Sequence, residues 1–391
     1  MKRADRRQVR RDPLAYLEQL RRVSTTGVIA LPWGGWCVSD PALAQELLRH
    51  PGFHDGKSTF FRHDLLPTRA AQVQVGHAVR DVLRARLPEY RAALDVAVTG
   101  LPATSRWPAA GAGLVYRCLA DLLLHPLTPA GARSSMDRAA RAGVLRRPAR
   151  VWQRARAEVW RGRLVTALVE QVADRRAHPA DRPRDVLDAV VGACPDEVGD
   201  RAVAELYLAL FRAVVTPVGT SLAWSVLLAC LHHPADAPWP WPADQVVREA
   251  LRHRPTVWMV GRTVSRPTEF GGVPVRPGEL LSVSPYLLHH DERHWADPAA
   301  FRPERWAAKD GLGPYLPFGA GPFTCVGAAV AQVLTTEALA ALAGGARLAV
   351  TRGDARPSPG LVDGASPRPF TVHRTVLATG GPDHAKGGDL P

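Results

Sequence analysis

The chain has 391 residues, of which 46% are hydrophobic and 22% charged, the balance of a globular protein with a substantial core. Its formal net charge of +13 comes almost wholly from arginine, and the arginines are scattered along segments of helical pattern. A nucleic-acid-binding protein would interleave basic and aromatic residues on one element. The composition therefore argues against nucleic-acid binding and favours a basic face that docks an acidic protein.

The sequence contains five cysteines, Cys37, Cys118, Cys194, Cys230 and Cys325. They form no CxxC pair or other metal-binding spacing, and an odd number without a signal peptide predicts reduced thiols in a cytoplasm. Residues 1–12 are too highly charged for a signal sequence or a membrane anchor. We therefore expect a cytoplasmic protein.

The N-terminal part predicts a helix over 13–22 and short strands over 27–31 and 35–38. A second helix should begin at Asp40 and Pro41, since aspartate caps helices and proline suits the first helical position. Helical patterns broken by proline and glycine then run from 70 to 190.

A long apolar helix is predicted over 203–231. Residues 213–231 carry no charge over 19 positions, which is long enough to cross a bilayer. However, Thr216, Pro217 and Ser225 interrupt the apolar run, so we expect a helix buried through the middle of a soluble protein instead.

The character of the sequence changes after a proline-rich link and a helix over 243–253 that ends before Pro255. Three strand-like runs follow, then an irregular section, a glycine loop and a last helix; they cover 257–264, 269–275, 279–284, 291–316 and 326–342. The coarse prediction is a mainly helical protein with small β-sheets. Residues 1–379 should form one domain and 380–391 a flexible tail.

The sharpest motif is the run from Phe318 to Gly327, FGAGPFTCVG. Gly319 and Gly321 allow a tight turn that brings the backbone close to a flat ligand. Cys325 then stands at the start of a helix, where free N–H groups and the helix dipole stabilise a thiolate. The alternative is a glycine-rich turn with a buried structural cysteine.

A second motif places Glu249 and Arg252 one helical turn apart, so that the two side chains share a face and can pair. Such pairs also occur on solvated surfaces. The run FRPERW over 301–306 follows, and alone it could be an ordinary proline turn. A buried network of Glu249, Arg252 and Arg305 would nevertheless satisfy all of its charges.

In this order and spacing the three motifs resemble the ExxR helix, the PERF-type meander and the cysteine loop of the cytochrome P450 superfamily, in its soluble bacterial type. The resemblance is strong over about 230–350, moderate at the N-terminus and weak over about 90–200. It implies a mainly helical fold with small sheets that encloses haem b (iron protoporphyrin IX) in a single large domain. Cys325 would then be the iron ligand, and Glu249, Arg252 and Arg305 a structural network.

The resemblance also assigns residues around the cofactor. Arg262 and His289 match positions that bind haem propionates, for which charge-assisted hydrogen bonds are suited. Phe318 should pack beside the thiolate. Phe323 stands where the family usually has Arg or His, and this removes a charged hydrogen bond worth about 1.5–3 kcal/mol. We expect Arg80 and Arg84 to compensate, since they lie on the helix following Gly76-His77, where the family often has a His and an Arg four apart.

The central helix departs from the family, which usually carries an acid followed by a threonine there to relay protons to dioxygen. This chain offers Thr216-Pro217-Val218 or Val218-Gly219-Thr220, and neither run contains an acid. Either Thr216 or Thr220 supplies the alcohol and water does the rest, or the chemistry needs no relay. In the second case the enzyme abstracts hydrogen from an activated substrate, takes peroxide directly, or uses acid groups of the substrate.

Two further features concern the pocket and the partner. Val257, Trp258 and Met259 follow the Pro255 turn, so they either line the substrate pocket or form an apolar strand of the core. The connection over 234–249 is shorter than is usual in the family, which indicates a trimmed helix near the face where electron donors dock.

The sequence thus predicts a haem-thiolate oxidoreductase of natural-product metabolism that hydroxylates or oxidatively couples a small molecule or a peptide. A ferredoxin-type donor would supply its electrons, and we expect a monomer that binds neither nucleic acid nor membrane. The alternatives are a peroxide-driven peroxygenase and a haem-binding recruitment protein without oxygen activation.

Overall fold

The structure is a computed structural model that describes residues 3–24, 26–50, 53, 65–66, 68–142, 144, 150–234, 237–308, 312–358 and 366–377. The predicted tail over 380–391 lies outside the described residues.

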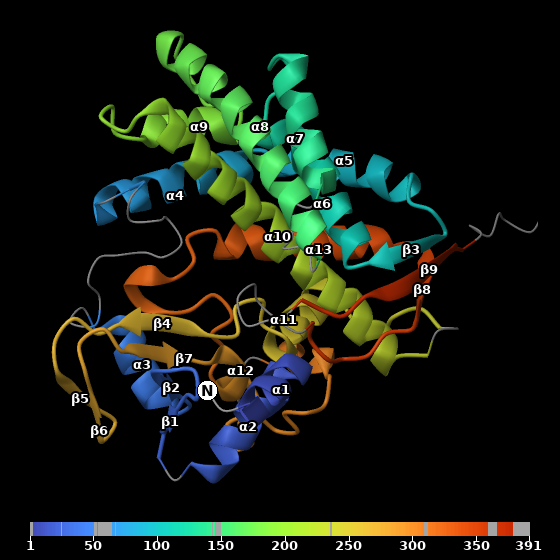
Figure 1. The fold of residues 1–391 in the computed structure, drawn as a ribbon. Coiled ribbons are helices and arrows are strands. Elements are labelled where there is room, and N and C mark those ends of the chain that lie inside the picture. Colours follow the sequence, from blue (N-terminus) through green and yellow to red (C-terminus); the bar gives the residue numbers. More distant parts are fainter. Residues whose placement is uncertain are drawn as a thin grey trace, which may run out of the picture.

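Helices make up most of the described chain, as the sequence predicts. In chain order they are α1 (Arg3–Arg11), α2 (Pro13–Val23), α3 (Pro41–Arg49), α4 (Arg69–Ala85), α5 (Leu87–Thr99), α6 (Ala109–Leu123), α7 (Ala130–Ala142), α8 (Val151–Ala177), α9 (Val186–Ala193), α10 (Asp200–His232), α11 (Ala243–His253), α12 (Pro285–His289) and α13 (Ala328–Ala343). Two single turns of 3-10 helix are η2 (Pro303–Ala307) and η3 (Gly321–Phe323). Figure 1 shows α4 to α9 gathered at one end of the molecule and α1 to α3 with the larger sheet at the other.

The strands form three small sheets. They are β1 (Val28–Ala30), β2 (Trp36–Val38), β3 (Thr104–Trp107), β4 (Val260–Thr263), β5 (Thr268–Phe270), β6 (Val273–Val275), β7 (Leu280–Val283), β8 (Ala346–Thr351) and β9 (Phe370–Val376). The largest sheet has the order β1-β2-β7-β4, with β2 parallel to β7; β3-β9-β8 and β5-β6 form the other two. The run predicted as one strand over 269–275 is a hairpin, because Gly271 and Gly272 adopt φ angles of 57° and 78° and turn the chain.

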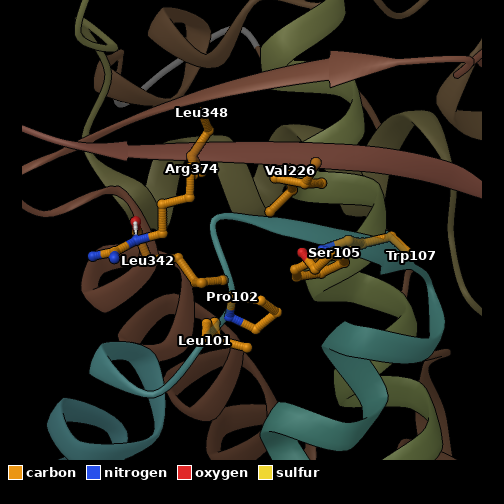
Figure 2. A pocket seen from close by; sticks show the side chains of 9 residues that line it. Leu101, Pro102, Ser105, Trp107, Val226, Leu342, Leu348 and Arg374 are labelled. Atoms are coloured by element: carbon orange, nitrogen blue, oxygen red, sulfur yellow. Dashed lines mark hydrogen bonds between the residues drawn. The ribbon is translucent and has the colours of Figure 1, made fainter.

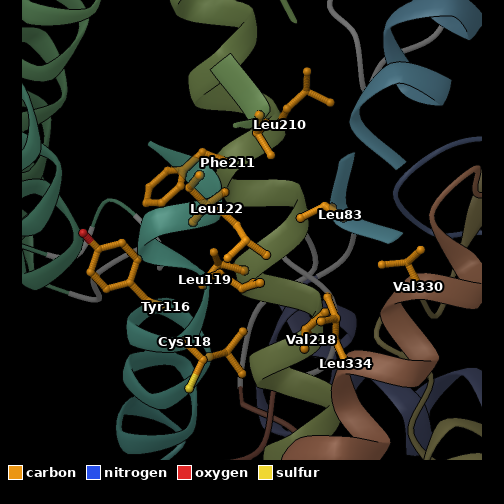
Figure 3. Close-up of a cluster of buried hydrophobic side chains, with 14 of the residues drawn as sticks. Leu83, Tyr116, Cys118, Leu119, Leu122, Leu210, Phe211, Val218, Val330 and Leu334 are labelled. Atoms are coloured by element: carbon orange, nitrogen blue, oxygen red, sulfur yellow. The ribbon is translucent and has the colours of Figure 1, made fainter. Parts of the chain in front are cut away.

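The core lies along α10, which passes through the middle of the molecule (Figure 1). Its side chains pack with those of α4, α6 and α13 in the largest apolar cluster, and Figure 3 shows Val218 of α10 beside Leu334 of α13. The backbones of α10 and α6 approach closely, since a Cβ on Gly219 would lie 2.8 Å from the Cα of Ala112. This helix is long and apolar enough to cross a membrane, but 67% of its most apolar window is buried inside the protein.

Proline does not end α10. Pro217 lies inside a helix that continues from Asp200 to His232. Because proline has no amide hydrogen, the carbonyl of Ala213 lacks its usual partner four residues along the helix. The helix is held at this point by its packing rather than by an unbroken ladder of hydrogen bonds.

Candidate functional site

The cysteine loop between η3 and α13 is built on two glycines in the left-handed region. Gly319 and Gly321 have φ angles of 73° and 72°, which favour glycine. The loop closes on itself, because the Cys325 amide donates to the Phe318 carbonyl at 3.0 Å. The Cys325 carbonyl accepts from Ala328, the first residue of α13, at 3.2 Å. The cysteine therefore stands in the turn that leads into the helix.

The two sides of the loop differ. A Cβ on Gly321 would lie 2.1 Å from the Leu48 carbonyl oxygen of α3, so the backbones approach closely there. A Cβ on Gly319 or on Gly327 would meet no atom within 4 Å. The loop thus rests on α3 at one position and borders open space at the two glycines that flank the cysteine run.

The Cys325 side chain is exposed, in contrast to the other four cysteines. Partial burial of the sulfur raises the pKa of the Cys325 thiol, and the Gly327 amide opposes this shift. The helix α13 begins three residues later, with Gly327 as its N-cap, so Cys325 precedes the first turn of the helix. Burial raises the pKa to about 12 for Cys37 and Cys230 and to about 11 for Cys118 and Cys194, as expected of inert thiols.

The structure brings Glu249, Arg252 and Arg305 together. Arg252 meets Glu249 through two hydrogen bonds, at 3.0 Å from Nε and 2.9 Å from Nη2, and both side chains are fully buried. Arg305 donates from Nε to Glu249 at 3.1 Å and is 9% exposed. Arg252 also donates to the carbonyls of His289, Pro298 and Ala300 at 2.7, 3.0 and 3.1 Å.

Two donors to Glu249 were missed by the sequence analysis. The indole N–H of Trp306 donates to Oε2 at 2.9 Å, and the backbone amide of Arg302 donates to Oε1 at 3.0 Å. Both donors belong to the FRPERW run, in which the 3-10 turn η2 places the Trp306 and Arg305 side chains beside the Glu249 carboxylate. The carboxylate therefore ties this run to α11.

His289 does not have the predicted role. The imidazole is fully buried, with Nδ1 3.1 Å from the Arg252 carbonyl and Nε2 accepting the Leu316 amide at 2.8 Å. Both ring nitrogens are thus engaged by backbone groups, and burial lowers the pKa to about 3. A neutral ring without a spare donor cannot bind a propionate, so this prediction is wrong.

The arginines expected near the cofactor lie on separate elements. Arg262 is half-buried on β4 and donates to the Gly261 carbonyl at 2.8 Å. Arg80 pairs with Asp81 at 2.7 Å, and Arg84 is exposed one turn further along α4. Their roles stay predictions. The arginine of α4 that contacts the cysteine loop is Arg69, whose guanidinium donates to the Pro322 carbonyl; no sequence signal singled it out.

The candidate pocket residues are divided between core and surface. Trp258 is 4% exposed and belongs to an apolar cluster with Leu14, Leu17 and Tyr286, so it lies in the core, two residues before the start of β4. Met259 packs against the same cluster, whereas Val257 is 47% exposed. Phe318 is half-buried against the main core.

The central helix has a half-buried stripe within its otherwise buried middle. Ala209, Ala213, Thr216 and Thr220 are spaced at i, i+4, i+7 and i+11, which places them on one face. Pro217 is also half-buried. Both candidate threonines therefore lie on the one side of α10 that is less tightly covered.

Two cavities lie away from this site. One has a volume of about 10 Å³, room for about one water, and is lined by Leu101, Pro102, Ser105, Trp107, Val226, Leu342, Leu348, Val372 and Arg374. Figure 2 shows this cavity from close by. A pocket of about 250 Å³ lies where the short connection between α10 and α11 meets the end of α13 and β8, with Trp239, Trp241 and Arg347 in its lining.

Comparison with known proteins points to one family. Residues 243–343 match the family model for cytochrome P450. Cyclooctatin synthase of Streptomyces melanosporofaciens is 32% identical over 222 residues, which cover 49% of this chain and 47% of that protein. Human cytochrome P450 3A5 is 41% identical over 87 residues, 22% of this chain and 17% of that protein. The chain thus matches half or less of the length of these curated relatives.

The fold is similar to that of solved structures over almost the whole chain. The ligand-free cytochrome P450 TbtJ1 has a TM-score of 0.74 at 19% identity, covering 93% of this chain and 97% of that one. HmtN, a post-tailoring hydroxylase involved in himastatin biosynthesis, has a TM-score of 0.68 at 20% identity, covering 91% and 95%. Both likenesses cover almost the whole chain, so the mainly helical fold with small sheets is confirmed.

Proposed function

We propose that the chain, whose residues 243–343 match the cytochrome P450 family model, is a haem-thiolate oxidoreductase of natural-product metabolism that activates dioxygen. The observation that carries this proposal is the Cys325 side chain, exposed in a loop whose flanking glycines border open space. The family's cofactor is haem b, and thiolate-ligated haem supplies the electron donation that favours O–O cleavage.

The residues present fit such a group. Cys325 presents one sulfur donor, which suits a metal whose other ligands come from a macrocycle. The missing Cβ atoms of Gly319 and Gly327 leave room for a flat group to approach the loop. The propionates would be held by Arg262, Arg80 and Arg84 as predicted, without His289.

The remaining residues of the site hold the loops in place. Glu249 collects the Arg252 and Arg305 side chains, and Arg252 in turn binds three backbone carbonyls of the segment 289–300. A buried network in which every charge is paired is rigid, whereas a half-satisfied one is costly. These residues position the segment that leads to the cysteine and take no part in the chemistry.

Proton delivery is the feature in which this chain should differ from its relatives. Reduction of each dioxygen needs two electrons and two protons in addition to the electrons and hydrogen that the substrate supplies. The half-buried stripe from Ala209 to Thr220 offers the hydroxyls of Thr216 and Thr220, and the carboxyl group of Glu205 on the same face stands eleven residues before Thr216. We propose that one threonine, with water, carries the protons; a peroxide-driven reaction, which needs no such relay, is the second candidate.

The substrate is proposed to be a small molecule or a peptide of specialised metabolism. Cyclooctatin synthase and the himastatin hydroxylase HmtN, by their names, serve such pathways. The electron donor is proposed to be of ferredoxin type, and the net charge of +13 suits docking of an acidic protein. We further propose that the protein acts as a cytoplasmic monomer.

The proposal is tested by turnover of a ligand found in a spin-state screen of the haem-loaded protein. Reactions run under ¹⁸O₂ with a ferredoxin, its reductase and NADPH, and in parallel with hydrogen peroxide alone. We expect product with the electron donor, labelled if the reaction is hydroxylation and unlabelled if it is coupling. Equal rates with peroxide alone would favour the peroxygenase, and no turnover with either oxidant would favour a recruitment protein.

A further inference from the structure

His289 connects two segments that are distant in the sequence. It is the last residue of α12 and is fully buried. On one side its Nδ1 lies 3.1 Å from the carbonyl oxygen of Arg252 on α11. On the other side its Nε2 lies 2.8 Å from the amide nitrogen of Leu316. The ring therefore bridges the ExxR helix and the segment that enters the cysteine loop.

The two partners fix the tautomer of this histidine. A backbone amide can only donate, so Nε2 must accept from Leu316 and carry no hydrogen. The proton then sits on Nδ1, which donates to the Arg252 carbonyl. No other protonation state satisfies both contacts, since an imidazolium would turn Nε2 into a second donor facing the Leu316 amide.

The segment beyond Leu316 leads directly to the cysteine. The Leu316 carbonyl accepts the amide of Gly319 at 3.1 Å, and the Phe318 carbonyl accepts the amide of Cys325 at 3.0 Å. The Tyr315 ring stacks on His289 with centroids 5.5 Å apart, which holds the preceding residue as well. The entry to the loop is thus fixed to His289 immediately before the loop begins.

We propose that His289 is a positioning residue that sets the place of the Cys325 sulfur by accepting the Leu316 amide. This inference rests on the proposed function, because the place of the sulfur matters through its bond to haem iron. It assigns His289 a role in forming the iron–sulfur bond in place of the propionate contact expected from the sequence.

Two substitutions separate the two hydrogen bonds of the ring. In His289→Gln the longer side chain can still offer an acceptor near the position of Nε2, so the Leu316 contact can persist. In His289→Asn the shorter side chain can still donate to the Arg252 carbonyl but cannot reach Leu316. Each variant loses one bond of similar strength, so their difference reports the Leu316 contact.

The readout is the reduced, carbon-monoxide-bound haem protein. An intact iron–thiolate bond gives a strongly red-shifted Soret band, and a lost bond gives an unshifted one. We expect His289→Asn to lower the ratio of shifted to unshifted band by about tenfold, the effect of one buried hydrogen bond. His289→Gln should keep the wild-type ratio, although urea unfolds the two variants at similar midpoints.

His290→Asn is the matched control. His290 adjoins His289, its Nδ1 lies 2.9 Å from the Tyr286 carbonyl oxygen, and its ring packs against those of Tyr286 and His253. His290→Asn should keep the wild-type ratio of shifted to unshifted Soret band even where its free energy of unfolding falls. Equal ratios in the Gln and Asn variants, or a loss in the control as large as in His289→Asn, would overturn the positioning role. An absent shifted band in the wild-type protein would instead overturn the proposed function.

Discussion

Glu249 is the residue on which the polar network of this protein depends. Five N–H groups from Arg252, Arg302, Arg305 and Trp306 point at its two oxygens. Burial of an ion is tolerated only where such partners replace the lost water. One carboxylate therefore joins α11 to η2. Removing its charge would leave the guanidinium groups of Arg252 and Arg305 without a counter-charge.

Replacing this carboxylate should be costly. We expect Glu249→Gln to lower the free energy of unfolding by about 3–5 kcal/mol, since Arg252 and Arg305 would remain buried without a counter-charge. Urea unfolding measures the loss. The matched control is Glu89→Gln in the exposed Arg86–Glu89 pair, where we expect less than about 1 kcal/mol. A loss for Glu249→Gln no larger than for the control would contradict the network.

The threonines of α10 give a test of proton delivery. We expect one of the two variants Thr216→Val and Thr220→Val to lower the dioxygen-dependent rate about 10²-fold, the lower end of what a positioned proton donor contributes. The peroxide-driven rate of the same variant should not change, because peroxide brings its own protons. Unchanged dioxygen-dependent rates in both variants would remove the threonines from the relay.

Sequence patterns predicted the roles of some residues of the site and missed those of others. Glu249, Arg252 and Arg305 could be found because they stand in motifs that resemble those of a known family. The role of His289 could not, because its partner at Nε2 is a backbone amide 27 residues away, and a backbone amide leaves no trace in the sequence. Arg69 was missed for the same reason, since it donates to the backbone of Pro322.

At the scale of elements, the helices were predicted well where a cap or a breaker marks their ends. Asp40 accepts the amides of Ala42 and Leu43 at 2.9 and 3.0 Å, as the cap predicted at the start of α3 should. The sheet β3-β9-β8 was missed, because Thr104 pairs with His373 across 269 residues. Such pairing depends on the tertiary fold rather than on a local pattern.

The close contact between α10 and α6 predicts that a glycine-to-alanine substitution has opposite effects on stability at Gly219 of α10 and at Gly162 of α8. Gly219→Ala should destabilise the protein, because the new Cβ would lie 2.8 Å from the Ala112 Cα and one backbone must move. Gly162→Ala on α8 meets no atom within 4 Å and should stabilise by about 0.5–1 kcal/mol. Thermal unfolding of both variants checks this, and stabilisation of Gly219→Ala would show that the helices are not in close contact.

At the scale of the whole molecule, buried neutral histidines should make the fold sensitive to acid. Burial lowers the pKa of His289 to about 3, and it lowers those of His253 and His290 well below the usual value, with Arg252 and Arg254 adding to the effect. The unfolded chain takes up these protons near pH 6.5, whereas the folded chain does not. The histidines therefore contribute stability above about pH 6.5 that is lost as the pH falls toward 3.

This loss can be separated from titration of the carboxylates. Between about pH 7 and pH 5 most carboxylates stay charged, so the fall in the free energy of unfolding should come from histidines, at up to about 1.4 kcal/mol per pH unit for each one. Urea unfolding at several pH values in this range measures the slope. A stability that is flat or that rises on acidification would contradict the burial of these rings as neutral groups.

The proposed function depends on one bond, between the Cys325 sulfur and haem iron. The direct measurement is the absorption spectrum of the reduced, carbon-monoxide-bound protein in three forms: wild type, Cys325→Ala and the control Cys230→Ala, whose thiol donates to the Leu348 carbonyl and packs against the main apolar cluster. We expect the strongly red-shifted Soret band in wild type and control and its loss in Cys325→Ala. A wild-type protein without that band, or a Cys325→Ala variant that retains it, would show that Cys325 is not the ligand of a haem iron.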